Sequence, residues 1–258
     1  MTLRVILLRS DGAHHRFLEM LLAENFDLIH VVEESEKNQI RRLRKKGKWM
    51  AWAWRQYHTA RRVIMGTAAY RRRYFEQIMK EPMKDAPTSQ VEWINDPTTT
   101  DVLLEKKADI IIVIGTSILR KQVLEDAGAT ILNIHGGWLP DYRGNHCYFF
   151  AQYFRDWKKI GSTIHQVNSG VDTGDIVDHI KPSLDVKKYS AESLYCDGER
   201  LAFYRLIEIL KELERGIPLT KIPQPQDMGR TFRSCDRKPF HELSMFLRYF
   251  FLRNQEKQ

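Results

Sequence analysis

The stretch DIIIVIG, from Asp109 to Gly115, is an unbroken run of β-branched apolar residues that ends at a glycine. A strand that faces solvent on one side alternates polar and apolar residues, whereas an unbroken run is typical of a strand covered on both faces. Parallel sheets flanked by helices bury their strands in this way. The stretch therefore favours a sheet with helices packed on both sides.

Strand-like and helix-like segments alternate along most of the chain. Between two strand-like runs, the segment 11–24 places Phe17, Met20 and Leu21 at helical spacing. This alternation predicts an α/β fold with a mostly parallel, doubly wound, Rossmann-like sheet, whose crevices lie at the carboxyl ends of the strands. We expect strands at 4–10, 27–34, 91–94, 109–115, 129–135, 161–168 and 175–184, and helices at 11–24, 98–108 (opened by a Thr or Asp cap), 118–128, 145–154 and about 191–215.

A basic segment interrupts this alternation. Residues 41–73 contain twelve Lys and Arg and no acidic residue, so the rest of the chain has a net charge of −4 against a total of +8. Trp49, Trp52 and Trp54 are interleaved with these charges. The segment predicts one or two amphipathic helices inserted in the α/β pattern at about 36–85.

Three interpretations of this insertion are open. Its helices could pack on the domain with their charges in solvent, or bind RNA, or bind an anionic membrane surface, where each Lys or Arg contributes about 1 kcal/mol. The interleaved Trp side chains favour a membrane interface, so we expect peripheral membrane contact through 41–73 and disfavour nucleic acid. The tail stretch FLRYFFLRN, at 246–254, offers a second apolar surface for a membrane or a homodimer.

Cysteine usage and hydropathy set the expected compartment. The chain has three cysteines, widely spaced and without a CxxC pair, which argues against a disulfide framework and a zinc site. The N-terminal apolar run is too short for a signal segment, and no run approaches the roughly 18 apolar residues of a spanning helix. We expect a cytoplasmic protein, peripheral to a membrane if the insertion binds one. Its domains are predicted at 1–185, with the insertion, and at 186–258, a C-terminal helix with a short extension.

Polar side chains stand at the end of the predicted strand ATILNIH. Asn133 and His135 are two residues apart, so they point to the same side at its carboxyl end. In GVDTGDI, Asp172 lies 37 residues after His135, in a short turn between two predicted strands. Alone, each feature is more often structural, because Asp favours turns. Together they predict one crevice that holds an amide, an imidazole and a carboxylate. The other histidines lack further ligands at suitable spacing, so no metal site is expected.

Three segments, DIIIVIGTSIL, NIHGGWLPDYRG and GSTIHQVNSGVDTGDIV, resemble the folate-dependent formyltransferases over about residues 108–180. That family includes glycinamide ribonucleotide transformylase, methionyl-tRNA formyltransferase and the sugar N-formyltransferases. The resemblance implies the formyltransferase fold, a one-carbon transferase activity, 10-formyltetrahydrofolate as co-substrate, and Asn133, His135 and Asp172 as the catalytic residues. The residues that it places around the co-substrate are Gly115, Thr116, Ser117, Ile118, Leu119, Asn168, Gly170 and Val171.

The expected chemistry is the attack of an amine on a formyl carbonyl. Asn133 and a protonated His135 are donors suited to the oxyanion that forms, a contact worth about 3 to 4 kcal/mol per donor. Asp172 would keep His135 charged and, directly or through a water, accept the proton of the amine. No metal is required. His165, in the same segment, could assist the reaction or only orient its neighbours.

Departures from the family bear on the acceptor. RSDGAHH, at 9–15, has one glycine where the purine enzyme has a glycine-rich turn for the substrate phosphate. About 40 residues follow Arg215, which is too few for the β-barrel domain of the tRNA enzyme. We therefore expect a nucleotide-linked amino sugar, with Arg143 or basic residues of the insertion on the diphosphate and Trp138 or Tyr142 stacked on the base or sugar. The full expected acceptor set is Gly136, Gly137, Trp138, Tyr142 and Arg143.

A tRNA acceptor and a glycinamide ribonucleotide acceptor remain as alternatives. A non-enzymatic alternative is a binding module of the same fold that uses the basic segment for nucleic acid or a membrane. Such a module would not need an intact set of catalytic residues. Because Asn133, His135 and Asp172 are all present, we disfavour it.

Overall fold

A computed structural model describes residues 2–79, 86–225 and 227–255, with side chains up to Arg248. Its central sheet has seven strands in the order β3-β2-β1-β4-β5-β7-β8. The first five strands in this order are parallel, and the last two are antiparallel to their neighbours. This confirms the predicted α/β fold with a mostly parallel sheet. The strands are β1 (Arg4–Arg9), β2 (Asp27–Glu34), β3 (Thr88–Val91), β4 (Ile110–Ile114), β5 (Thr130–His135), β7 (Ser162–Gln166) and β8 (Ile176–Ile180).

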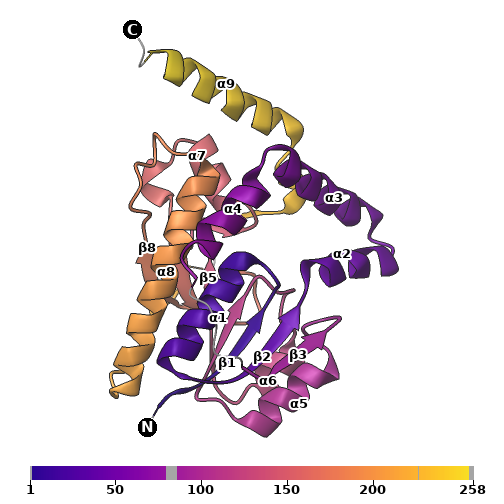
Figure 1. The fold of residues 1–258 in the computed structure, drawn as a ribbon, viewed down its shortest axis with the longest axis vertical. Helices are drawn as coiled ribbons and strands as arrows, with labels where there is room; N and C mark the ends of the chain where they lie inside the picture. Colours follow the sequence, from indigo (N-terminus) through magenta and orange to yellow (C-terminus); the bar gives the residue numbers. More distant parts are fainter. Residues whose placement is uncertain (1, 80–85, 226, 256–258) are drawn as a thin grey trace.

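Helices cover both faces of the sheet (Figure 1). In β4, Ile110, Ile112 and Ile114 pack in one core with α1 (Ala13–Asn25) and α8 (Ala191–Glu214). Ile111 and Val113 pack in the other core with α5 (Pro97–Lys106) and α6 (Lys121–Asp126). Fully burying one such side chain stabilises the fold by about 1.5 to 3 kcal/mol. The unbroken apolar run thus reflects a strand with a core on each side.

The long helix α8 is part of the main core. Its Phe203, Leu206 and Leu210 are fully buried with residues of α1 and β1. The chain division predicted at residue 185 is therefore not matched by a division of the hydrophobic core, because this helix supplies one layer of the sheet's cover.

The insertion forms three helices, α2 (Glu36–Lys45), α3 (Trp49–Ile64) and α4 (Thr67–Glu76), rather than the predicted one or two. Gly47 and Gly66 lie between them with φ of +67° and +68°. Such left-handed backbone ends a helix and is strained for residues with a Cβ. Phe75 of α4 is fully buried against α1. Residues 80–85 of the predicted insertion lie outside the described residues.

The C-terminal part forms a smaller cluster beside the sheet. Strand β6 (Tyr142–Gly144) pairs with β9 (Arg230–Phe232), and both pack on α7 (Cys147–Tyr153). Helix α9 (Pro239–Gln255) extends from this cluster at the top of Figure 1. Short 3-10 turns lie at Trp157–Lys159 and Ser234–Asp236. Within the described ranges, no helix is both long and apolar enough to cross a bilayer. The predicted apolar surface at 246–254 falls mostly on side chains outside the described set.

One predicted strand is displaced. The expected strand at 91–94 is observed four residues long at Thr88–Val91, and residues 92–96 turn into α5. The Asp96 carboxylate accepts a hydrogen bond from the Thr98 amide, and Pro97 occupies the first turn. Both features favour a helix start at this point, so the chain leaves the sheet earlier than its apolar residues indicated.

Candidate active site

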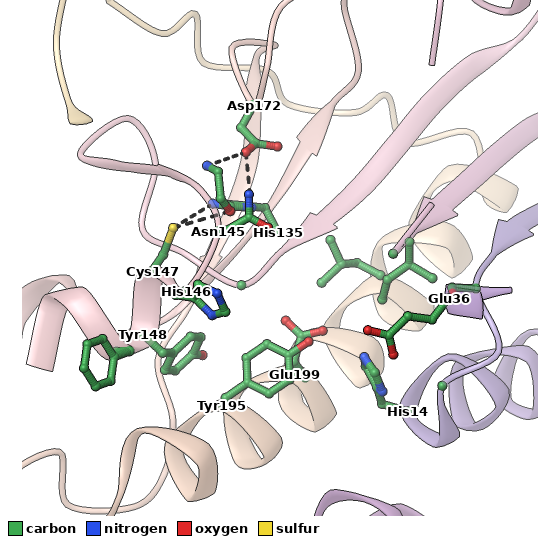
Figure 2. A pocket seen from close by; sticks show the side chains of 18 of the residues that line it. His14, Glu36, His135, Asn145, His146, Cys147, Tyr148, Asp172, Tyr195 and Glu199 are labelled. Atoms are coloured by element: carbon green, nitrogen blue, oxygen red, sulfur yellow. Dashed lines mark hydrogen bonds and ion pairs between the residues drawn. The ribbon is translucent and has the colours of Figure 1, made fainter. Parts of the chain in front are cut away.

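A cavity of about 690 Å³ lies at the carboxyl ends of β4 and β5 (Figure 2). Asn133 and His135 of β5 line it together with Asp172 from the loop between β7 and β8. The remaining walls come from the insertion helices, α8 and α9. The sheet topology thus brings the three predicted catalytic residues to one cavity, at the edge where doubly wound sheets place their sites.

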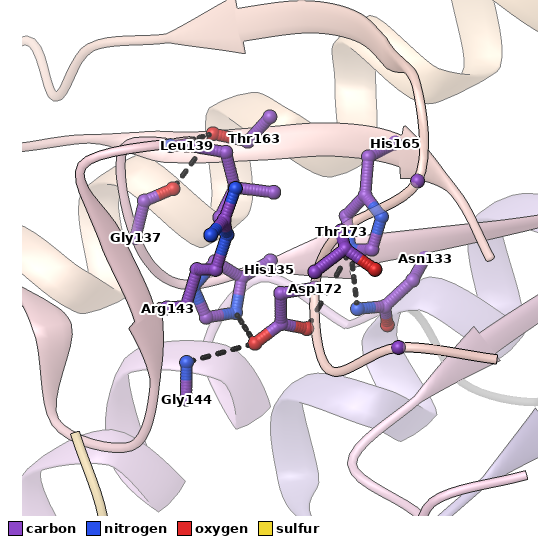
Figure 3. A network of polar contacts seen from close by, with 12 residues as sticks. Asn133, His135, Gly137, Leu139, Arg143, Gly144, Thr163, His165, Asp172 and Thr173 are labelled. Atoms are coloured by element: carbon purple, nitrogen blue, oxygen red, sulfur yellow. Dashed lines mark hydrogen bonds and ion pairs between the residues drawn. The ribbon is translucent and has the colours of Figure 1, made fainter. Parts of the chain in front are cut away.

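Asp172 accepts contacts from both flanks of the site (Figure 3). Its Oδ2 accepts a hydrogen bond from the Gly144 amide at 2.8 Å and lies 3.5 Å from His135 Nδ1. Its backbone has φ of +52°, an uncommon conformation for a residue other than glycine. The Gln224 side chain donates to the carbonyl of Asp172 at 3.2 Å and so holds this strained turn from the C-terminal segment.

Both ring nitrogens of His135 face acceptor oxygens. Nδ1 faces Asp172, and Nε2 lies 2.9 Å from the carbonyl oxygen of Tyr142. An imidazolium can donate to both, whereas a neutral ring can donate to only one. The thiol of Cys147 lies 3.7 Å from Nε2, and burial raises its pKa, so the thiol stays neutral beside the ring.

His165 orients the amide of Asn133. The two residues are opposite each other in the antiparallel register of β5 and β7. Asn133 Nδ2 lies 3.0 Å from His165 Nε2, and His165 Nδ1 lies 2.9 Å from the carbonyl of Gln166. This pattern fits a neutral ring that donates from Nδ1 and accepts from Asn133. Burial lowers the pKa of His165 to about 4, with Asp172 opposing and His135 adding to the shift. Its 3.7 Å approach to Asp172 is therefore not an ion pair at neutral pH.

The residues predicted for the co-substrate all line the cavity. Ser117 is held by the buried Glu34, which accepts its amide at 2.7 Å and its hydroxyl at 2.9 Å. Gly115 has φ of +69°, and a Cβ there would lie 2.2 Å from the His15 ring. A larger residue would not fit without displacing that ring. On the facing loop, the side chain of Asn168 accepts from the amide of Gly170.

The predicted acceptor residues divide into two groups. Gly136 lines the cavity, whereas Gly137, Trp138, Tyr142 and Arg143 do not. The Trp138 ring stacks on His179 at 4.3 Å, and the Tyr142 hydroxyl donates to Asp156. Their acceptor role stays a prediction, and the geometry assigns these side chains to the scaffold instead.

Arg143 supports the loop that carries Asp172. Its guanidinium donates to the carbonyl of Met228 at 2.8 Å and to the Gln224 side chain at 3.1 Å. Because Gln224 in turn donates to Asp172, Arg143 acts on the site through the C-terminal segment.

The insertion supplies cavity residues that the sequence analysis did not single out. Arg55, Arg61, Arg62 and Arg71 line the cavity, as does Arg237 before α9. Helical spacing gave a signal for Arg55 and Arg62, which are seven residues apart on one helix face. The face that turns inward could not be predicted, because it depends on where the insertion packs.

Two arginines share each of two carboxylates in this wall. Glu36 lies 2.5 Å from Arg62 and 3.6 Å from Arg55. Glu242 lies 2.6 Å from Arg237 and 3.4 Å from Arg61. Each cluster therefore keeps one positive charge in excess.

Within the described residues, no group of three His, Cys, Asp or Glu side chains is arranged to hold a metal ion.

A protein-family model described as "Formyl transferase" matches residues 65–209, more than half of the chain. A methionyl-tRNA formyltransferase from Chlamydia muridarum is 31% identical over 149 residues, covering 55% of this chain and 44% of that protein. The chain spans about half the length of the curated relatives that it matches.

Solved structures share the fold at low identity. Phosphoribosylglycinamide formyltransferase from Anaplasma phagocytophilum has a TM-score of 0.58 and 20% identity, covering 90% of this chain and 100% of its own. A sugar 3N-formyl transferase solved in the presence of dTDP and 5-N-formyl-THF has a TM-score of 0.54 and 11% identity, covering 92% of this chain and 72% of its own.

Proposed function

We propose that this chain, which belongs to the formyl transferase family, is an enzyme that moves a formyl group from 10-formyltetrahydrofolate to an amine. The amine nitrogen attacks the formyl carbon, and the carbonyl oxygen becomes an oxyanion. The bond from the formyl carbon to N10 of the folate then breaks as N10 regains a proton. The products are a formamide and tetrahydrofolate.

The residues of the site suit these steps. Asn133 donates one amide hydrogen to His165, which leaves the second for an oxyanion in the cavity. His135 supplies a second donor, and Asp172 holds its ring and favours its charged form. The same pair can relay the proton of the attacking nitrogen to N10. The loops at 115–119 and 168–171 line the cavity beside these residues and form the proposed place for the folate.

We propose an acceptor that carries its amine on a nucleotide-linked sugar. The observation that carries this proposal is the excess positive charge in the cavity wall, where Arg55 and Arg62 share Glu36, and Arg61 and Arg237 share Glu242. A diphosphate can bind arginines by paired, charge-assisted hydrogen bonds and so offset this excess. A neutral amine acceptor would leave it unbalanced.

Turnover with 10-formyltetrahydrofolate and a panel of amino-sugar nucleotides tests this function. Replacement of Arg62 by Gln is expected to raise the acceptor KM about 10- to 100-fold, because a charged hydrogen bond is worth about 1.5 to 3 kcal/mol. The folate KM should not change. Arg41→Gln is the matched control, since Arg41 pairs with the exposed Glu92 outside the cavity.

A tRNA acceptor is the second candidate. It is favoured by the relatives named methionyl-tRNA formyltransferase and by the basic insertion. The same assay separates the two candidates. Folate turnover with charged initiator tRNA, but with none of the amino-sugar nucleotides, would overturn the sugar proposal.

A further inference from the structure

Glu199 of α8 is a buried carboxyl group in the wall of the same cavity. It is 1% exposed, and it lines the cavity together with Tyr195 and Gly136. A Cβ built on Gly136 would lie 3.4 Å from Glu199 Oε1, so the carboxyl group is packed against the residue that follows His135. Figure 2 shows His135 between Asp172 and Glu199.

No ion pair of the described residues includes Glu199. Its Oε1 accepts a hydrogen bond from Ser162 Oγ at 3.1 Å, and the Ser162 hydroxyl in turn contacts the Tyr148 hydroxyl at 2.9 Å. Tyr195 on the same helix also hydrogen-bonds the carboxyl group. A buried carboxylate that is met only by hydroxyl groups is poorly stabilised.

The charged and titratable groups around Glu199 leave it close to half-ionised at neutral pH. Arg71 of α4 faces it but is paired with Glu192 at 2.7 Å. Burial raises the pKa values of Tyr148, Tyr195 and Cys196, so these groups stay neutral. Burial likewise raises the pKa of Glu199 to about 7, against the opposing effects of Ser162, Arg71 and Tyr195.

The proposed reaction needs a base in addition to Asp172. An aliphatic amine reaches the enzyme at neutral pH mainly as an ammonium ion, which has no lone pair for attack. Asp172 is engaged by the Gly144 amide and by His135, contacts that hold it as a carboxylate. A group that takes up and releases a proton near neutral pH is the effective kind of base.

We infer that Glu199 accepts the ammonium proton of the acceptor. The ammonium and the Glu199 carboxylate become a neutral amine and a carboxylic acid. The amine then attacks the formyl carbon, and the acid returns its proton to solvent after the product leaves. This inference rests on the proposed function and deepens it, because it requires an acceptor whose amine has ordinary aliphatic basicity, as on a sugar carbon.

The pH profile of Glu199→Gln tests the inference. The variant keeps the size of the side chain and an acceptor oxygen for Ser162. With a basic amine acceptor, kcat/KM at pH 7 should fall about 100-fold and recover as the pH approaches the pKa of the amine. With an acceptor of weakly basic amine, the variant should match the wild type. Asp197→Asn is the control: Asp197 is 3% exposed on the same helix but binds Ser183 away from the cavity. Its pH profile should match that of the wild type.

A second variant guards against misfolding of the first. Ser162→Ala removes one hydrogen bond that stabilises the Glu199 carboxylate, so the acidic limb of the kcat/KM profile should move to higher pH. An unmoved limb in Ser162→Ala, or an unchanged rate and profile in Glu199→Gln, would overturn the inference while the proposed function stands. Failure of the wild-type protein to transfer formyl to any amine would instead refute the proposed function. Unchanged binding of 5-formyltetrahydrofolate to Glu199→Gln is expected, and its loss would show that the residue acts on the folate and so contradict the inference.

Discussion

At the scale of single residues, two buried carboxyl groups in one cavity have opposite surroundings. Asp172 receives a backbone amide and faces two imidazole rings, so its charge is balanced by donors. Glu199 is met by hydroxyl groups, and its burial raises its pKa. Carboxyl groups whose environments separate their proton affinities in this way often divide the acid and base steps of a reaction.

The environment of Glu199 has a consequence for stability. Its pKa is about 7 in the folded protein and near the ordinary 4.5 when unfolded, so the folded state holds a proton that the unfolded state loses. Wild-type stability should therefore decline as the pH rises from about 4.5 to about 7. Glu199→Gln lacks this loss and should be more stable than the wild type by up to about 3 kcal/mol at pH 8, but by less than 1 kcal/mol at pH 5.

Urea unfolding of both proteins at pH 5 and pH 8 measures this difference. A gap of equal size at the two pH values would contradict the raised pKa. Asp197→Asn serves as the comparison, because the Asp197 carboxylate is stabilised by Ser183 and Arg200, and its loss should destabilise the protein at both pH values.

At the scale of elements, the insertion has two different faces. Its inner face carries Arg55 and Arg62 to the cavity, while Val63 and Ile64 at the end of α3 are 68% and 84% exposed. Removal of 41–73 would therefore take away a wall of the site, and catalysis would not survive it. The membrane contact expected from the sequence stays a prediction, for which this exposed apolar end is the natural place.

The turn between α3 and α4 sets how the insertion reaches the cavity. Gly66 has φ of +68°, and no atom lies within 4 Å of a Cβ built there. Gly66→Ala should therefore cost about 1 to 2 kcal/mol from backbone strain alone, without steric clash. Gly66→Asn should cost less, since Asn tolerates this conformation. Equal stability of the Ala variant and the wild type in urea would contradict the strained turn.

At the scale of the whole molecule, one cavity is built from parts far apart in sequence. The sheet supplies Asn133 and His135, the insertion and the segment before α9 supply arginines, and α8 supplies Glu199. Ligands that bind such a composite site favour the folded state of all these parts at once.

Binding should therefore stabilise the entire fold. A ligand present at 100 times its Kd raises the free energy of unfolding by about 2.7 kcal/mol. We expect this gain from 5-formyltetrahydrofolate and, separately, from an amino-sugar nucleotide. Arg62→Gln should lose the second gain and keep the first, as measured by urea unfolding. If it lost both gains, the assignment of Arg62 to the acceptor side would be wrong.

The sequence by itself determined the sheet and the approach of three polar residues to its edge. An unbroken apolar run requires cover on both faces, and the side-chain alternation of a strand puts Asn133 and His135 on one side. These are local consequences of backbone geometry, so they can be predicted from a short stretch of chain.

Only the tertiary structure decided the rest of the site. Glu199 occupies an ordinary helical position in the sequence, and its burial beside Gly136 depends on how α8 crosses the sheet. Trp138 and Arg143 stand within the most suggestive stretch of the chain, yet they contact His179 and Gln224 outside the cavity. The inward face of the insertion likewise depends on its packing. Which side chains share a cavity is set by contacts between distant segments, and the chemistry of each residue alone does not fix those contacts.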